Sequence, residues 1–161
     1  MLIPVWQRLL GVLIYMLPWS DTAPFAQSLN EAPEIIQILF ALLYLPTYPI
    51  VILERAMPFG LGSLVLFLAL FLAVIRNPKV PYFLRFNTLQ ALLLSIVLAV
   101  LGLAFFGILQ RPLEGLLIFS TLSTTVLIAI LVIVIFALIE CLRGREPDLP
   151  GISQAVRMQL S

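Results

Sequence analysis

Two long apolar runs without a charged residue fill most of the second half of the chain, at residues 88–109 and 116–139. An α-helix rises about 1.5 Å per residue, so roughly 20 apolar residues cross the ~30 Å hydrocarbon core of a bilayer. Inside hydrocarbon a backbone must satisfy its own hydrogen bonds, which a helix does. We therefore expect two membrane-spanning helices here, and the surplus length of 116–139 predicts that this helix is tilted.

The composition of the whole chain fits this expectation. Hydrophobic residues make up 62% of the 161 residues and charged residues 11%, whereas soluble domains are about half apolar and a quarter charged. The net charge of +1 leaves no basic face that could neutralise nucleic-acid phosphates. We expect an all-α integral membrane bundle that forms a single domain over residues 1–161 and binds no nucleic acid.

Three further apolar stretches are shorter or interrupted by proline. The stretch 59–75 is near the lower limit for a span, and 2–19 contains Pro4 and Pro18. The stretch 35–53 contains two prolines three residues apart, and each removes backbone hydrogen bonds that lipid cannot replace. We predict four spans, at 2–19, 59–75, 88–109 and 116–139, with an interfacial or re-entrant helix at 35–53. Exchanging the roles of 2–19 and 35–53 gives the same charge distribution, so that choice stays open.

The few charges predict the orientation. With four spans, seven of the nine basic residues fall on one side, and only Arg55 and Arg111 fall on the other. Because basic loops stay on the cytoplasmic side, we expect both termini and the 76–85 region to be cytoplasmic or stromal. The opposite face is then expected to carry four acidic residues, Asp21, Glu31, Glu34 and Glu54.

Several classes of chemistry have no candidate residues. The chain has no histidine and one cysteine, Cys141, which excludes Cys/His zinc sites, iron–sulfur ligation and Ser-His-Asp or Cys-His catalysis. No glycine-rich phosphate-binding motif occurs. No Asp, Glu, Lys or Arg lies in the middle of an expected span, so a proton relay or ion-coupled pump has no candidate. We expect no enzymatic activity, no cofactor and no metal.

Small and polar residues follow one face of the helix that begins near residue 88. Steps of three and four place residues on one helix face, and small residues there allow close helix packing. Packing is the favoured interpretation, although Gln90, about a quarter turn away, also suits a substrate path. The candidate packing or contact residues are Arg85, Asn87, Gln90, Ala91, Ser95, Ala99 and Gly102.

Hydroxyl side chains gather at the start of the last span. In lipid such hydroxyls most often bond the carbonyl one turn back, which is the favoured role, and the alternative is a polar vestibule near one membrane face. The cluster consists of Ser120, Thr121, Ser123, Thr124 and Thr125.

The tail breaks at Pro147 and Pro150 and then repeats apolar residues at helical spacing. This pattern predicts a short amphipathic helix at 152–160, on the membrane surface or on a partner. The candidate tail-docking residues are Glu140, Arg143, Pro150, Ile152, Ser153, Val156 and Gln159.

Three segments together resemble a known family. They are LIYMLPWSDTAPF (Leu13–Phe25), PYFLRFNTLQALLLSIVL (Pro81–Leu98) and LIECLRGREPDLPGISQAVRMQL (Leu138–Leu160). The chain resembles the twenty-kilodalton component of the translocon at the chloroplast inner envelope membrane, the Tic twenty family. The resemblance implies a four-span helical protein with both termini stromal or cytoplasmic, and a part in moving preproteins within a multi-subunit complex. Because no transit-peptide pattern is found, we expect a cyanobacterial or plastid-encoded member, located in a cyanobacterial plasma or thylakoid membrane or the chloroplast inner envelope.

Three functions follow as hypotheses. The first is a non-enzymatic translocon subunit that moves polypeptides across or into the membrane. The alternatives are a small-solute permease subunit and an assembly or scaffold factor for a larger membrane complex. The expected partners are the lipid bilayer, other membrane subunits, further copies of the chain and a polypeptide substrate.

Overall fold

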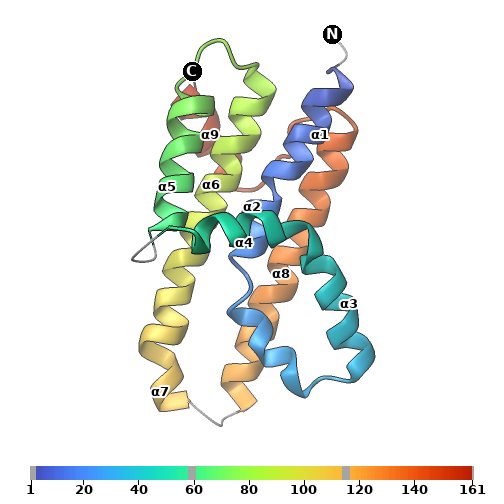
Figure 1. The fold of residues 1–161 in the computed structure, drawn as a ribbon, viewed down its shortest axis with the longest axis vertical. Helices are drawn as coiled ribbons and strands as arrows, with labels where there is room; N and C mark the ends of the chain where they lie inside the picture. The colour runs from blue at the N-terminus through green and yellow to red at the C-terminus, as the bar shows by residue number, and fades with distance from the viewer. Residues whose placement is uncertain (1–2, 58–60, 114–116, 161) are drawn as a thin grey trace.

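All the regular structure in the described part of the chain is helical. The computed structural model describes residues 3–57, 61–113 and 117–160, and within these ranges every regular element is a helix. The expected all-α class is confirmed. The predicted span boundaries at residues 2, 59 and 116 lie outside the described residues. Most helices follow one long axis, whereas α4 (Tyr48–Arg55) runs across it (Figure 1).

The two uncharged runs form the longest helices. Helix α6 (Tyr82–Gly102) continues through a π-helical segment, η5 (Leu103–Leu109), into α7 (Gln110–Leu113). The second run forms α8 (Leu117–Leu142). Both Tyr82–Pro112 and Leu117–Leu142 are long and apolar enough to cross a membrane, as predicted.

The N-terminal segment packs on both long helices. It consists of α1 (Val5–Ile14), α2 (Met16–Ser20) and the 3-10 helix η1 (Phe25–Glu31). The predicted single span at 2–19 is therefore interrupted at Tyr15. A proline ring clashes with the carbonyl four residues earlier, and the residues four before Pro18 and Pro24 are the last residues of α1 and α2. The main core consists of Tyr15, Trp19 and Phe25 with residues of α6, η5 and α8.

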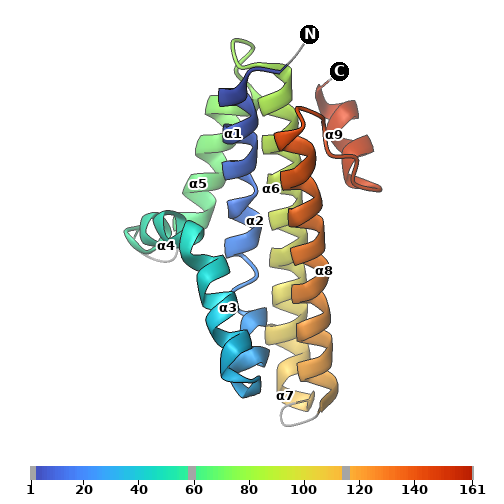
Figure 2. The same cartoon turned by 90° about the vertical axis from the view of Figure 1, so that its right-hand side faces the viewer.

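The second weak stretch is helical throughout but bent. Helix α3 (Glu34–Tyr44) leads through the 3-10 helix η2 (Leu45–Thr47) into α4. Together Glu34–Arg55 form a third segment of spanning length and hydropathy. However, α3 follows the bundle axis and α4 crosses it at about mid-height (Figure 2). The stretch predicted as an interfacial or re-entrant helix at 35–53 therefore has an axial half and a transverse half, which meet at the bend around Pro46 and Pro49.

Helix α5 (Gly62–Leu70) and the π-helical segment η4 (Phe71–Ile75) return the chain to the end where it began. Gly62 starts α5 directly against α4, since a Cβ at this position would collide with the backbone of Glu54. The predicted span 59–75 appears as the shorter apolar helix Gly62–Ile75. Among the described residues, three segments therefore reach spanning length, and the predicted count of four spans is not confirmed.

Both termini and the loop 76–81 lie at one end of the bundle, called here the termini end (Figures 1 and 2). The predicted tail helix forms α9 (Ile152–Leu160). It packs against α6 of the same chain, where Val156 joins Phe86 and Leu89 in a second core. This corrects its expected position on the membrane surface or on a partner, because its apolar face is already covered by the bundle.

Candidate functional site

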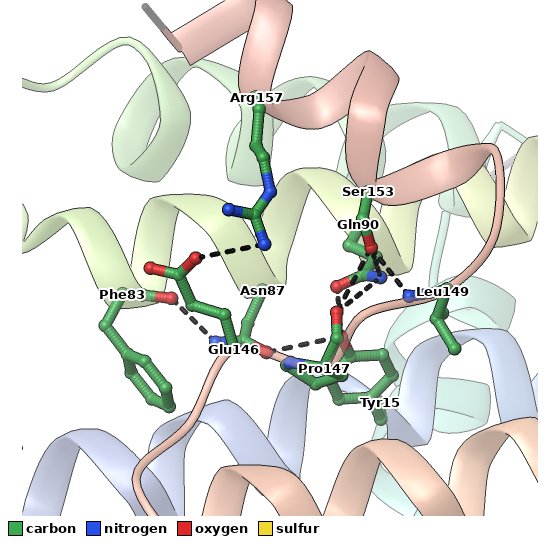
Figure 3. A network of polar contacts seen from close by, with 9 residues as sticks. All are labelled: Tyr15, Phe83, Asn87, Gln90, Glu146, Pro147, Leu149, Ser153 and Arg157. Carbon is green, nitrogen blue, oxygen red and sulfur yellow. Dashed lines mark hydrogen bonds and ion pairs between the residues drawn. The ribbon is translucent and has the colours of Figure 1, made fainter.

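A buried polar network lies between α1, α6 and the tail near the termini end (Figure 3). Asn87 and Gln90 project from α6, and both are fully buried together with Tyr15 at the end of α1. The Tyr15 hydroxyl lies 3.0 Å from Gln90 Oε1 and 3.2 Å from Asn87 Oδ1, and it donates its single proton between these two oxygens. In a low-dielectric interior such bonds are strong, and an unpaired member is costly.

Gln90 connects this network to the tail. Its Nε2 donates to the carbonyl of Pro147 at 3.2 Å and to Ser153 Oγ at 3.0 Å. Ser153 Oγ also accepts a 2.7 Å bond from the backbone N–H of Leu149. One glutamine amide therefore joins α6, the Pro147–Leu149 turn and the first turn of α9, as Figure 3 shows.

Asn87 is held from two further directions. Its Nδ2 donates to the Phe83 carbonyl one turn back at 2.7 Å. Its Oδ1 accepts from Cys141 Sγ on α8 at 3.1 Å. The network thus joins both long helices, the N-terminal segment and the tail, and the geometry serves to hold these four segments in register.

Charged side chains flank the network on the tail side. Arg157 lies 3.8 Å from Glu146 and places its guanidinium 5.5 Å from the centre of the Phe86 ring. Arg85 Nε donates to the Ile75 carbonyl at 2.8 Å, which ties the start of α6 to the end of η4. Glu140 and Arg143 form an ion pair at 3.1 Å.

The structure divides the predicted tail-docking residues into two groups. Ser153 and Val156 are buried against the bundle and Ile152 is half-buried, whereas Pro150 and Gln159 are exposed. Sequence reasoning missed Tyr15, Cys141 and Pro147 as members of the network. The sequence signalled the network through three of its polar residues, Asn87, Gln90 and Ser153.

The predicted small-residue face of α6 also divides into two parts. Ala91 is fully buried next to the network. Further along, Ser95, Ala99 and Gly102 line an open cavity, and a Cβ at Gly102 would meet no neighbour within 4 Å. Close helix contact on this face therefore ends after Ala91.

The five hydroxyl residues of α8 point in different directions. Thr121 and Thr125 donate to carbonyls one turn back on their own helix, each at 2.7 Å. Thr124 donates to Ser28 of η1 at 3.0 Å. Ser120 and Ser123 line a cavity of about 260 Å³ that also contains polar side chains of η1. Two of the five thus serve their own helix, and three face η1 or this cavity.

The sequence of this chain is similar to those of known proteins. Residues 4–156 match the family model described as "Chloroplast import apparatus Tic20-like". A Tic20 family protein of Synechocystis is 31% identical over 153 residues, covering 95% of this chain and 92% of the relative. The Arabidopsis thaliana protein TIC 20-v, chloroplastic, is 28% identical over 95% of this chain and 70% of its own length. A Ycf60 protein of Gracilaria tenuistipitata var. liui is 33% identical over 61% of this chain and 49% of its own length.

Proposed function

The chain belongs to the Tic20-like family of the chloroplast import apparatus, and from this premise we propose that it is a non-enzymatic membrane subunit of a protein translocation complex. It moves polypeptides across or into a membrane together with other subunits. The observation that carries the proposal is the family match over residues 4–156, which takes in all the described helices except the end of α9.

The exposed apolar surface supports membrane partners. Only 6% of the apolar window in Glu34–Arg55 is buried within the chain, and 22% and 28% in the two longer segments. Apolar patches of this size are covered by lipid or by other proteins. The α3–α4 segment is therefore the surface that we assign to contact with neighbouring subunits, further copies of the chain or lipid.

We assign four crossings to the bundle. The N-terminal segment, the path α3–α4–α5, the path α6–η5–α7 and α8 alternate in direction between the two ends. The termini end carries the basic residues of α1, of the loop 76–81 and of the tail, so it is assigned to the cytoplasm or stroma. The membrane is a cyanobacterial plasma or thylakoid membrane or the chloroplast inner envelope.

Photo-crosslinking to an arrested polypeptide tests this function. A photoreactive residue is placed in turn at Ile38, Leu103 and Ile128, which are exposed positions on three apolar segments. A polypeptide stalled by a folded domain should crosslink to at least one position, and the crosslink should disappear when the polypeptide is released. A non-targeted polypeptide serves as the control. Crosslinks to lipid and resident subunits alone would contradict the proposal.

A further inference from the structure

A half-open cavity of about 530 Å³ lies between α2, α4, α5 and α6. Most of its lining is apolar, including Leu64, Phe67 and Leu92. Four polar side chains interrupt this lining: Asp21, Glu54, Ser63 and Ser95. Two of them are carboxylates in a chain in which charged residues are scarce.

The cavity lies at mid-depth of the bundle. Its α6 residues lie between Leu92 and Gly102, around the middle of the apolar segment Tyr82–Pro112. Ser95 is therefore about 20 Å from the nearer end of that segment, at about 1.5 Å per residue. The transverse helix α4, which carries Glu54 in its last turn, crosses at the same level. Asp21 and Glu54 were expected on the face opposite the termini, but the structure places both in the lining of this cavity.

Within the part of the chain that the structure describes, the two carboxylates have no positive partner. Among the described residues, neither Asp21 nor Glu54 lies within salt-bridge distance of a lysine or arginine. Glu54 accepts a 2.9 Å hydrogen bond from Ser63, and the charge of Glu54 repels that of Asp21. The Ser95 hydroxyl is enclosed beside Asp21. Acidic groups at membrane depth are costly unless a counter-charge or water reaches them.

We propose that this cavity binds the lysine or arginine side chain of a polypeptide inside the membrane, an inference that rests on the proposed translocation function. The cationic group lies between Asp21 and Glu54, and the aliphatic stem lies along Leu64 and Phe67. Long basic side chains combine these two properties, and the volume falls in the range of ordinary ligand pockets. The cavity thereby accommodates basic residues that hydrocarbon would otherwise exclude.

A pair of membrane peptides tests the cavity directly. The full-length protein is reconstituted in vesicles of phosphatidylcholine and phosphatidylglycerol, with a photoreactive residue at Leu64. One apolar peptide of roughly 20 residues carries a central lysine, and its twin carries norleucine. We expect about tenfold more crosslinking to the lysine peptide, since a buried charge pair is strongly favoured over an unpaired charge.

Variants and a second position supply the controls. The double variant Asp21→Asn with Glu54→Gln should reduce the crosslinking yield of the lysine peptide to that of the norleucine peptide. A photoreactive residue at Ile128, on the outer face of α8, should crosslink the two peptides equally. Equal yields at Leu64 in the unmodified protein would overturn the inference without recourse to any variant.

A further experiment with a second lipid shows whether the occupant of the cavity is a polypeptide side chain or a lipid headgroup. Vesicles that contain phosphatidylethanolamine offer a competing ammonium group, and the lysine preference should persist there. Loss of the preference would identify the lipid as the occupant and overturn the proposal. Failure here leaves the crosslinks of an arrested polypeptide at Ile38, Leu103 and Ile128 intact, so it is distinguishable from failure of the proposed function.

Discussion

Gln90 joins the C-terminal helix to α6 through buried hydrogen bonds, beside the apolar contacts of Val156. In Gln90→Leu, the Tyr15 hydroxyl, the Pro147 carbonyl and Ser153 each lose one of their partners, and each lost hydrogen bond is worth about 0.5–1.5 kcal/mol. We expect α9 to detach, which hydrogen exchange of the 152–160 amides in detergent would report as a loss of protection of about tenfold or more. The matched control is Gln154→Leu, the same change at an exposed position of α9. Equal exchange in the two variants would contradict this role of Gln90.

The sequence identified half of this network. Asn87, Gln90 and Ser153 stand out because polar side chains are rare in an apolar chain and are costly there without a partner. Tyr15 and Cys141 do not stand out, since both residue types are common in apolar helices. Their pairing with Asn87 joins positions 72 and 54 residues away, and helical periodicity relates only residues a few turns apart.

At the scale of elements, length and proline content predicted the helices more reliably than their directions. The uncharged runs became α6–α7 and α8 because nothing in them interrupts backbone hydrogen bonding. Prolines follow the ends of α1, α2 and α3, at positions 18, 24 and 46, although 2–19 was predicted as a single span. A proline removes a hydrogen bond but does not set the direction in which the chain continues, so the transverse course of α4 depends on its tertiary contact with Gly62.

Close packing of α1 rests on Gly11. A Cβ at this position would lie 3.2 Å from Phe83 Cε1 and 3.3 Å from Cys141 Sγ, whereas one at Gly107 would meet nothing within 4 Å. Overpacking typically costs about 1–3 kcal/mol, so Gly11→Leu should lower the thermal midpoint in detergent. Gly107→Leu adds the same side chain in open space. It should change the free energy of unfolding by no more than about 0.5 kcal/mol and so leave the thermal midpoint nearly unchanged. A Gly11→Leu protein as stable as the Gly107→Leu protein would mean that α1 does not approach α6 and α8 this closely.

At the scale of the whole molecule, the fold brings the segments that carry most of the basic residues to one end of the bundle. The loop 76–81, the start of α1 and the tail meet at the termini end, and Arg8 Nη1 donates to the Leu142 carbonyl there at 3.4 Å. These segments hold most of the basic residues, which the positive-inside rule assigns to one compartment. The sequence could predict that the basic segments lie at one end, because the side on which each loop lies depends only on how many times the chain crosses before it. The depth of Glu54 depends on the bend between α3 and α4, so it could not be predicted.

Thiol labelling in oriented vesicles tests this arrangement. The natural Cys141 is fully buried, so an impermeant maleimide should not reach it in the folded protein from either side. In a Cys141→Ser background, single cysteines at Lys79, Gln154 and Glu31 are all at exposed positions. We expect Lys79→Cys and Gln154→Cys to be labelled from the cytoplasmic or stromal side, because the loop and tail share one end. Glu31→Cys, at the end of η1, should be labelled only from the other side. The path α3–α4–α5 is the only crossing assigned between residues 31 and 79. If Glu31→Cys and Lys79→Cys were labelled from the same side, this path would not cross the membrane.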